Sequence, residues 1–325
     1  MKNIKKYLLL LVMAIVMVSC NNNNATDSNE ANENSDKTSG DKGTIALVIH
    51  RQDDDWSQSF AKGFEEAVND LDGYSFDWSN PNGDLQTQIA NIESFTQKGV
   101  KGMQIIPLDV DAIVPAVSQA KEAGVAIITE GPSTDYVMTS DSYGGGQQAA
   151  KALVENMGEE GKIAILEITA QMPGVLLRTQ GFKDYIAKYP GIEIVEENKV
   201  MTTDEAITTA ENIYTAHPDL TGIYGSFANA TIGAGRAAKN MNRKDVTVVG
   251  IDGDKEILRM IDEGWIYFTS SQNPPEQSAR SVKNLVDQIE GRDAEKEIVV
   301  DHIPVNKDNF KEVWKQLYGE EYTAN

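Results

Sequence analysis

The chain has 325 residues, with 29 Lys and Arg against 50 Asp and Glu, 3 His and a single Cys. Its formal charge of −21 argues against a nucleic-acid or anionic-membrane surface, because phosphates attract clustered basic residues. One Cys excludes an intrachain disulfide and a multi-cysteine metal site, and 325 residues with a hydrophobic content of 40% suit two globular domains.

The N-terminal segment is typical of a bacterial lipoprotein signal. Three Lys residues precede an apolar run of 12 residues, Tyr7 to Val18, which is too short to span a bilayer comfortably. The run ends in Met-Val-Ser-Cys, which resembles a lipobox. We expect residues 1–19 to be removed as a signal peptide and Cys20 to carry a lipid. The alternative is an ordinary signal peptide followed by an incidental Cys.

Residues 20–43 are mostly Asn, Ser, Asp, Glu, Thr and Gly. Such a segment buries too little apolar surface to order itself, so it predicts a flexible, lipid-anchored tether. No later segment approaches the length of a membrane span. The remainder is therefore expected outside the cytoplasm, attached to the bacterial cell membrane by the lipid alone.

From residue 44 onward the chain alternates apolar strand patterns with helical stripes of three- and four-residue spacing. Repeated alternation of this kind specifies parallel sheets covered by helices, so the sequence predicts an α/β fold with two doubly wound lobes. The first series has strands expected at 44–49, 74–78, 102–106 and 125–129. The second has strands expected at 162–167, 192–197, 222–225, 246–250 and 266–269, and one further apolar strand is expected at 298–303.

Polar and aromatic side chains follow the predicted strands, where ligands bind in open α/β sheets. Carboxylates and amides exchange hydrogen bonds with hydroxyl groups, and aromatic rings cover the apolar face of a sugar. The pattern therefore favours a cleft for a polyhydroxylated ligand. The candidate ligand-binding residues at these strand ends are His50, Asp54, Trp56, Glu130, Phe227, Asn229, Asp252 and Gln272.

Six segments resemble the type I periplasmic binding proteins, within them the ribose/galactose-type proteins of ABC importers. They include the turn Ile106-Pro-Leu-Asp-Val-Asp-Ala112, the helix start Arg178-Thr-Gln-Gly-Phe182, and Gln272-Asn-Pro274. The others are Thr44 to Trp56, Ala216-His-Pro-Asp219 and Val248-Val-Gly-Ile-Asp-Gly253. The resemblance runs from about Thr44 to Val305.

The resemblance implies two lobes joined by a three-crossing hinge that closes on a ligand. The lobes would be 44–141 plus 272–301 and 142–271 plus 302–325. Arg178 matches a family Arg that donates to ligand oxygens, and Asp252 an Asp that accepts from two adjacent hydroxyls. Gln272 matches a hinge-side Gln, Trp56 a stacking aromatic, and Asp54 a polar position usually held by Asn.

The sequence also departs from that pattern. Gly131-Pro132 stand where the ribose proteins have Asp-Arg, and Glu130 is the nearest acid. Phe227-Ala228 stand where they have Asn-Asp, with Asn229 displaced, and His50 replaces a small residue. One wall of the cleft is therefore rebuilt, and ribose itself is in doubt.

Several of these residues have plainer interpretations. At least one acid of the run Asp53-Asp54-Asp55 is expected to cap the following helix. His50 could be a neutral buried histidine, Trp56 a core residue, and Arg178 a surface ion-pair partner. The glycines of Gly233-Ala-Gly235 lie inside a helical pattern, so they predict close helix packing and not a dinucleotide site.

The leading hypothesis is a lipoprotein, expected to be monomeric, that binds a monosaccharide or related polyol and delivers it to an ABC permease. A chemoreceptor or sensor kinase is a further candidate partner; no metal, cofactor or catalytic residue is expected. Alternatives are a furanosyl-borate or tetrahydroxy autoinducer receptor, a nucleoside receptor, and a tethered glycosidase using acids such as Asp54 and Asp252. A transcriptional repressor is excluded, because a signal peptide and tether occupy the place of a DNA-binding helix-turn-helix.

Overall fold

A computed structural model describes residues 40–131, 134–169 and 173–324. The predicted signal peptide 1–19, the predicted lipid site Cys20 and most of the predicted tether lie outside the described residues. Over the described ranges, none of the helices combines the length and apolar character that crossing a bilayer requires. Nor does this part of the chain bring three His, Cys, Asp or Glu side chains together in an arrangement able to hold a metal ion.

Strands and helices alternate along nearly the whole described chain. Their order is β1 (Gly43–Val48), α1 (Asp55–Asn69), β2 (Tyr74–Ser79), α2 (Leu85–Lys98), β3 (Gly102–Ile105), α3 (Val114–Glu122), β4 (Ala126–Glu130), β5 (Val137–Ser140), α4 (Ser142–Met157), β6 (Glu160–Ile168), α5 (Pro173–Ile186), β7 (Gly191–Val200), α6 (Thr203–Ala216), β8 (Leu220–Gly225), α7 (Ala228–Asn240), β9 (Thr247–Ile251), α8 (Lys255–Glu263), β10 (Phe268–Ser271), α9 (Pro274–Ile289), β11 (Glu297–Val300), β12 (Ile303–Val305) and α10 (Phe310–Tyr318).

The strands form two 6-stranded sheets, ordered β11-β5-β4-β3-β1-β2 and β12-β10-β9-β8-β6-β7. All the strand pairs of the first sheet are parallel. In the second sheet only the edge pair of β10 and β12 is antiparallel. The predicted α/β fold with two parallel-sheet lobes is therefore confirmed.

The single strand predicted at 298–303 is wrong. Residues 297–300 form β11, which pairs with β5 in the first sheet, and residues 303–305 form β12, which pairs with β10 in the second. An apolar run shows that a segment is buried, but it does not show that the chain changes sheets within the run. Strand β5 and helix α10 were not predicted from the sequence.

The chain passes between elements of the two sheets at three places. It leaves the first sheet after β5, returns between β10 and α9, and leaves again between β11 and β12. The last two passages place Gln272 and His302 at the boundary between the sheets. This connectivity is the three-crossing arrangement that the resemblance implied.

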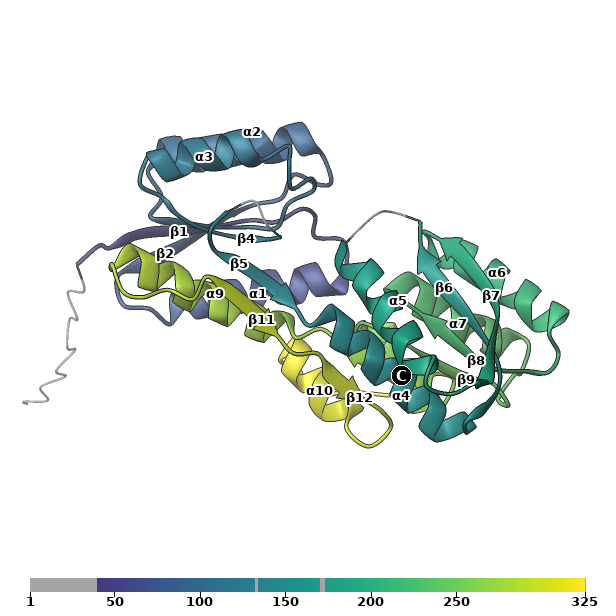
Figure 1. Cartoon of the computed structure of the whole chain (residues 1–325). Helices are drawn as coiled ribbons and strands as arrows, with labels where there is room; N and C mark the ends of the chain where they lie inside the picture. The colour runs from purple at the N-terminus through teal and green to yellow at the C-terminus, as the bar shows by residue number, and fades with distance from the viewer. Residues whose placement is uncertain (1–39, 132–133, 170–172, 325) are drawn as a thin grey trace, which may run out of the picture. The chain divides into compact units, whose positions relative to one another are not determined.

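Each sheet is buried on both faces, which explains the continuous apolar runs of its strands. Along β1, Ile45 and Leu47 join the core beneath α1 and α9, whereas Ala46 and Val48 join the core beneath α2 and α3. Figure 1 shows these two pairs of helices on opposite faces of the first sheet. In the second sheet, α4 and α5 contribute to one core and α6, α7, α8 and α10 to the other.

The predicted close helix packing at the glycines of α7 is confirmed. Phe60, Phe64 and Phe182 are fully buried core residues. A Cβ atom on Gly233 would lie 2.3 Å from the Ala206 Cβ, so this glycine allows α7 to approach α6 closely.

Candidate functional site

Asp252 lies just beyond the carboxyl end of β9 and has a left-handed backbone, with φ at 76°. Its backbone is held on both sides, because its N–H donates to the Ser270 carbonyl (3.1 Å) and its carbonyl accepts from Thr269 Oγ1 (2.6 Å). Its Oδ2 accepts the Ala228 N–H at 3.0 Å, at the start of α7. The strained backbone, which costs a non-glycine residue on the order of 1 kcal/mol, therefore aims the carboxylate at a helix N-terminus.

Arg178, on α5, lies beside this carboxylate and is only 6% exposed. Its Nη1 is 3.5 Å from Asp252 Oδ2 and 3.5 Å from the Ser226 carbonyl, both long for charge-assisted hydrogen bonds. Its Nε is buried and has no hydrogen-bond partner among the described residues. The guanidinium therefore has donors to spare.

Three hydroxyl groups near the same sheet edge are also buried without a described partner: those of Thr179, Tyr224 and Ser226. Leaving such a group unpaired costs about 1–3 kcal/mol. A ligand carrying hydroxyl groups could recover that cost by bonding to them.

Gln272 and Trp56 reach the same place from other elements. Gln272 Nε2 donates to Asp252 Oδ1 at 3.1 Å, so both oxygens of this carboxylate are engaged. Trp56, at the start of α1, stacks on Phe60 with ring centroids 5.1 Å apart and donates from Nε1 to Gln277 Oε1 at 3.2 Å. Trp56, Asp252 and Gln272 line one small cavity of about 10 Å³.

Glu130, the last residue of β4, also interacts with this group. Burial raises the pKa of Glu130 to about 7, and the positive charge of Arg178 opposes that rise. Glu130, which was predicted as a ligand-binding residue, therefore lies close enough to Arg178 for the positive charge to affect its pKa.

His50 and Asp54 have mainly local contacts. Asp54 is the N-cap of α1: its Oδ1 accepts the Ser57 N–H at 2.8 Å and its Oδ2 accepts the Ser57 Oγ–H at 2.9 Å, which confirms the predicted cap. Burial lowers the pKa of His50, and its Nδ1 has no described partner. The His50 ring is 6.2 Å from that of Trp56.

The side chains of Phe227 and Asn229 make their described contacts elsewhere, although the neighbouring Ser226 carbonyl and Ala228 N–H contact Arg178 and Asp252. Phe227 is 9% exposed and belongs to a core cluster of the second sheet. Asn229 donates to the Met201 carbonyl at 3.0 Å and accepts from Thr203 Oγ1 at 3.2 Å. Its amide is therefore engaged at both ends.

Tyr224 and Asp254 were not predicted from the sequence. Tyr224 lies within the apolar strand β8 and stacks on Phe182 with ring centroids 3.9 Å apart, so nothing in the pattern distinguished it from a core residue. Asp254 directly follows the segment Val248 to Gly253, and its position two residues after Asp252 was the available signal.

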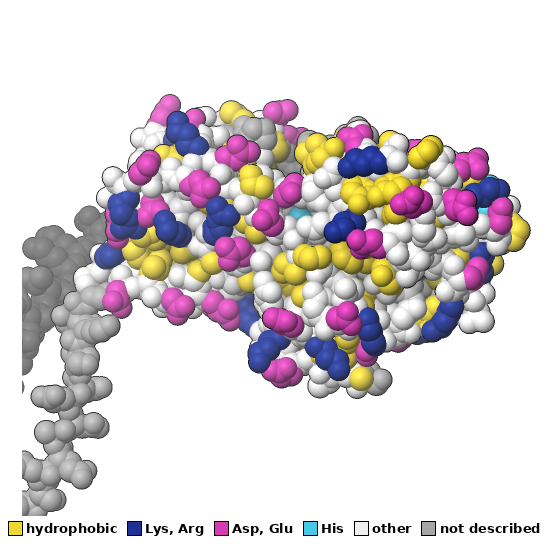
Figure 2. Space-filling view, turned by 60° about the horizontal axis from the view of Figure 1, so that its bottom comes forward, with side chains coloured by type: hydrophobic (Ala, Val, Ile, Leu, Met, Phe, Trp, Pro, Cys, Tyr) yellow, Lys and Arg dark blue, Asp and Glu magenta, His cyan; other side chains and the backbone are white. Residues whose placement is uncertain are grey.

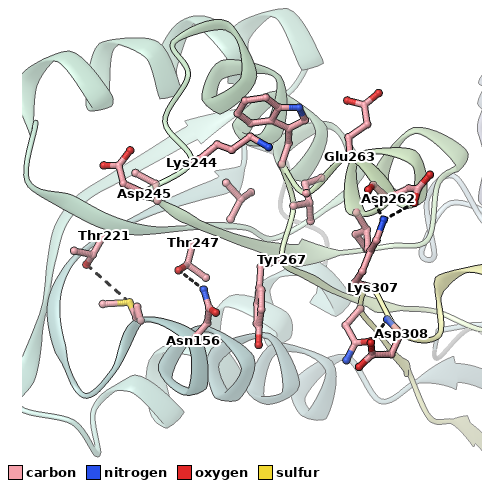
Figure 3. A pocket seen from close by; sticks show the side chains of 18 residues that line it. Asn156, Thr221, Lys244, Asp245, Thr247, Asp262, Glu263, Tyr267, Lys307 and Asp308 are labelled. Atoms are coloured by element: carbon pink, nitrogen blue, oxygen red, sulfur yellow. Dashed lines mark hydrogen bonds and ion pairs between the residues drawn. The ribbon is translucent and has the colours of Figure 1, made fainter.

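A larger cavity of about 640 Å³ lies at the amino ends of β8, β9 and β10. Figure 3 shows Tyr267 beside Asn156 and Thr247, with Lys307 reaching Asp262. None of the buried unpaired polar atoms of the described residues belongs to its lining. Judged by volume, this cavity would be the better candidate for a ligand site. Judged by buried polar groups without described partners, the better candidate is the site around Arg178 and Asp252 at the carboxyl ends of the strands.

The surface gives no sign of a polyanion-binding patch on the face shown in Figure 2. There, Lys and Arg side chains are interspersed with Asp and Glu. This mixture agrees with the acidic net charge of the chain.

Known proteins share both the sequence pattern and the fold. The ribose import binding protein RbsB of Escherichia coli K12 is 26% identical over 266 residues, which cover 80% of this chain and 89% of that protein. The D-apiose import binding protein of Actinobacillus succinogenes is 28% identical over 232 residues, covering 69% and 74% of the two chains.

Solved structures agree. An ABC transporter periplasmic solute-binding protein from Actinobacillus succinogenes, with bound D-allose, is 27% identical and has a TM-score of 0.76, covering 83% of this chain and 100% of that chain. A solute-binding protein from Bacillus halodurans with bound myo-inositol, 23% identical, shares the fold with a TM-score of 0.76 over 86% and 99% of the two chains. The periplasmic binding protein domain model matches residues 45–293, and the chain belongs to that family.

Proposed function

We propose that the protein binds a neutral monosaccharide or related polyol at the carboxyl ends of its two sheets and delivers it to an ABC transporter. The observation that carries this proposal is the group formed by Arg178 and Asp252, with unpaired hydroxyls beside it. A guanidinium donates to ring and hydroxyl oxygens, and a carboxylate accepts from adjacent hydroxyls. The similarity to ribose, apiose and allose binding proteins supports the same class of ligand.

The charges near the site favour a neutral ligand over an anionic one. Asp252 already partners Arg178, and Glu130 lies within reach of the same positive charge. An acidic sugar would compete with both carboxylates for one guanidinium and would meet their repulsion. A neutral polyol meets no such penalty.

Capture is proposed to occur by closure of two lobes, 44–141 plus 272–301 and 142–271 plus 302–325. The strand composition of the two sheets supports these limits. A ligand that contacts both lobes binds the closed state better than the open state, and only that difference in affinity can shift the equilibrium. Trp56 and Glu130 would supply contacts from the first lobe, and Arg178 and Asp252 from the second.

The cellular setting is proposed from the sequence. Removal of residues 1–19 and lipidation of Cys20 would hold the protein at the outer side of the cell membrane, through the tether 20–43. It would act as a monomer with an ABC permease as partner, and a chemoreceptor or sensor kinase could read the same closed form. The proposed role is binding and requires no catalytic residue.

Thermal unfolding of the purified protein tests the proposal against pentoses, hexoses, polyols, nucleosides and amino acids. A ligand that binds only the native state raises the midpoint once its concentration exceeds Kd. We expect one sugar or polyol to raise the midpoint of the native protein and not that of the Arg178→Gln variant. The matched control is Arg236→Gln, because Arg236 is an exposed arginine of α7 that pairs with Glu256 of α8 and not with Asp252.

A response to a nucleoside alone would replace the sugar proposal with a nucleoside receptor. A response restricted to a furanosyl borate would favour an autoinducer receptor. Hydrolysis of a glycoside by the native protein, lost in an Asp54→Asn or Asp252→Asn variant, would favour the glycosidase. Equal responses of the native protein and the Arg178→Gln variant would show that the site lies elsewhere.

A further inference from the structure

The helix α8 is capped by a carboxylate from a distant part of the chain. Its own N-cap residue, Asp254, makes no side-chain hydrogen bond to the helix. Instead Asp55 Oδ2 accepts the N–H of Lys255, the first residue of α8, at 2.8 Å. An acid at this end of a helix is favourable, because it satisfies an unpaired N–H and faces the positive end of the helix dipole.

This hydrogen bond joins elements of the two sheets. Asp55 begins α1, which packs on β1, β2 and α9, while α8 packs on α7 and α10. Beside the bond, the Tyr318 hydroxyl of α10 donates to the Gly253 carbonyl at 2.8 Å and lies 3.5 Å from Asp55 Oδ2. The Lys255 ammonium pairs with Glu320 at 2.9 Å, so the bond from Asp55 goes to the backbone and not to this charge.

Asp254 is the residue that could replace Asp55 as the cap. Burial, followed by the negative charges of Asp252, Asp55 and Asp54, raises the pKa of Asp254 well above its ordinary range. Neighbouring carboxylates that share a poorly hydrated site resist being ionised together. The arrangement therefore favours a protonated Asp254 beside the Asp55 side chain that accepts the α8 amide.

Little water has access to the contact. The cavity between these groups, lined by Asp55, Asp252, Asp254, Trp56 and Tyr318 among others, measures about 10 Å³, roughly the space of one water molecule. A hydrogen bond to an ionised acceptor is stronger in such surroundings than on an open surface.

We infer that Asp55 is a positioning residue that latches the first lobe to the start of α8 and thereby helps to set the closure equilibrium on which ligand capture depends. When the lobes part, Asp55 withdraws and Asp254, freed of a neighbouring charge, caps its own helix. A carboxylate faces the start of α8 in both arrangements, which keeps the net cost of the change small. Only Asp55 accepts the Lys255 N–H, because an N-cap side chain such as that of Asp254 accepts from the second or third N–H of its own helix. The inference rests on the proposed two-lobe binding function, but it concerns a contact that needs no ligand.

The test measures the distance between the lobes in ligand-free protein. Spin labels are attached at Ser118→Cys on α3 and Asn212→Cys on α6, both exposed, in the full chain carrying Cys20→Ser. Pulsed electron-electron resonance then gives the distance distribution. We expect Asp55→Asn to raise the ratio of long to short distances about tenfold.

The matched control is Asp53→Asn, which removes the same charge two residues away. Asp53 is exposed and pairs with Arg51 at 3.0 Å, so this variant should leave the distribution unchanged. Asp254→Asn mimics the protonated acid and should shift the distribution toward short distances. Hydrogen exchange of the Lys255 amide, measured on the same full chain, should be faster by a similar factor in Asp55→Asn.

The possible results test the role of Asp55 separately from the proposed sugar-binding function. A shifted distribution in Asp55→Asn, with Asp53→Asn unchanged, supports the latch even where no sugar binds. An unchanged distribution and unchanged Lys255 exchange overturn it. Weaker sugar binding by Asp55→Asn without a change in distance also overturns it, since Asp55 would then act as a ligand contact.

Discussion

The two walls of the candidate site use their polar side chains differently. On the second-sheet wall, Arg178 and Asp252 face each other, and hydroxyl groups beside them are buried without described partners. On the first-sheet wall, Asp54 caps its own helix and Trp56 is stacked and hydrogen bonded inside its own domain. Glu130 is the exception, because it is a half-buried acid whose pKa is affected by the positive charge of Arg178.

The difference shows which wall has hydrogen-bond donors and acceptors available for a ligand. The second wall is preorganised: Asp252 is held at four points, and its partners fix the carboxylate before any ligand arrives. The first wall offers the aromatic ring of Trp56 and the carboxyl group of Glu130, whose pKa is raised to about 7. We expect the second wall to dominate affinity and the first to tune selectivity.

The largest expected effect comes from Asp252. Asp252→Asn removes the charge that partners Arg178 but keeps a residue that tolerates the left-handed backbone. A hydrogen bond to a charged group contributes about 1.5–3 kcal/mol, so losing a carboxylate that accepts from two ligand hydroxyls should lower ligand affinity at least 100-fold by calorimetry. Asp245→Asn, an exposed acid of the same lobe, is the control, and equal affinities would refute a central role for the second wall.

The acid of the first wall makes stability depend on pH. The pKa of Glu130 is raised from 4.5 to about 7, so folding is favoured by its protonated form and that contribution is lost as pH rises between 4.5 and 7. The loss is up to about 3 kcal/mol. Urea unfolding of ligand-free protein should show that Glu130→Gln removes this decline.

His302 makes stability depend on pH in the opposite direction. In the wild-type protein it should therefore partly cancel the effect of Glu130 on the free energy of unfolding. Burial lowers its pKa from 6.5 to about 4, so its contribution to stability is lost as pH falls from 6.5 to 4. Glu130→Gln should therefore have stability that rises with pH over this range. Parallel profiles for wild type and variant would contradict the assigned role of Glu130.

A smaller effect is expected at the aromatic part of the first wall. Trp56→Ala removes the stack on Phe60 and the hydrogen bond to Gln277, and we expect affinity to fall about tenfold. Trp56→Phe keeps a ring and should lose less than half of that free energy. If the two variants bind equally weakly, the indole N–H and not the ring surface is the useful feature.

The smallest effect on binding is expected at Asn229. Its amide holds Met201 and Thr203, so Asn229→Ala should lower the free energy of unfolding by about 1 kcal/mol. Affinity should change less than twofold, because the side chain is engaged away from Arg178. A tenfold loss of affinity with unchanged stability would return Asn229 to the ligand-binding group.

Much of the fold follows from local patterns. The apolar runs and helical stripes predicted nearly all of the strands, because a strand buried on both faces must be apolar throughout. Strand β5 was missed because Val137–Ser140 has only four residues, two of them polar. Helix α10 was missed because its apolar stripe lies in a tail that has no strand after it.

The candidate site was predictable only in part, for a related reason. Asp252 and Gln272 were found because they follow strands and match a family pattern, whereas Arg178 was found from the family pattern alone. The structure brings the three together. Asn229 follows a strand as well, yet its amide turns to Met201, which no local pattern shows.

The sequence by itself determined the alternation of strands and helices, the two lobes and the strand ends where polar side chains collect, because these follow from side-chain periodicity and burial. Only the tertiary structure decided that residues 297–305 divide between two sheets, that the buried Tyr224 hydroxyl has no partner among the described residues, and that Asp55 caps a helix 200 residues away. These features depend on which groups meet in space after folding. A hydrogen bond between residues distant in the chain leaves no periodic trace in either segment.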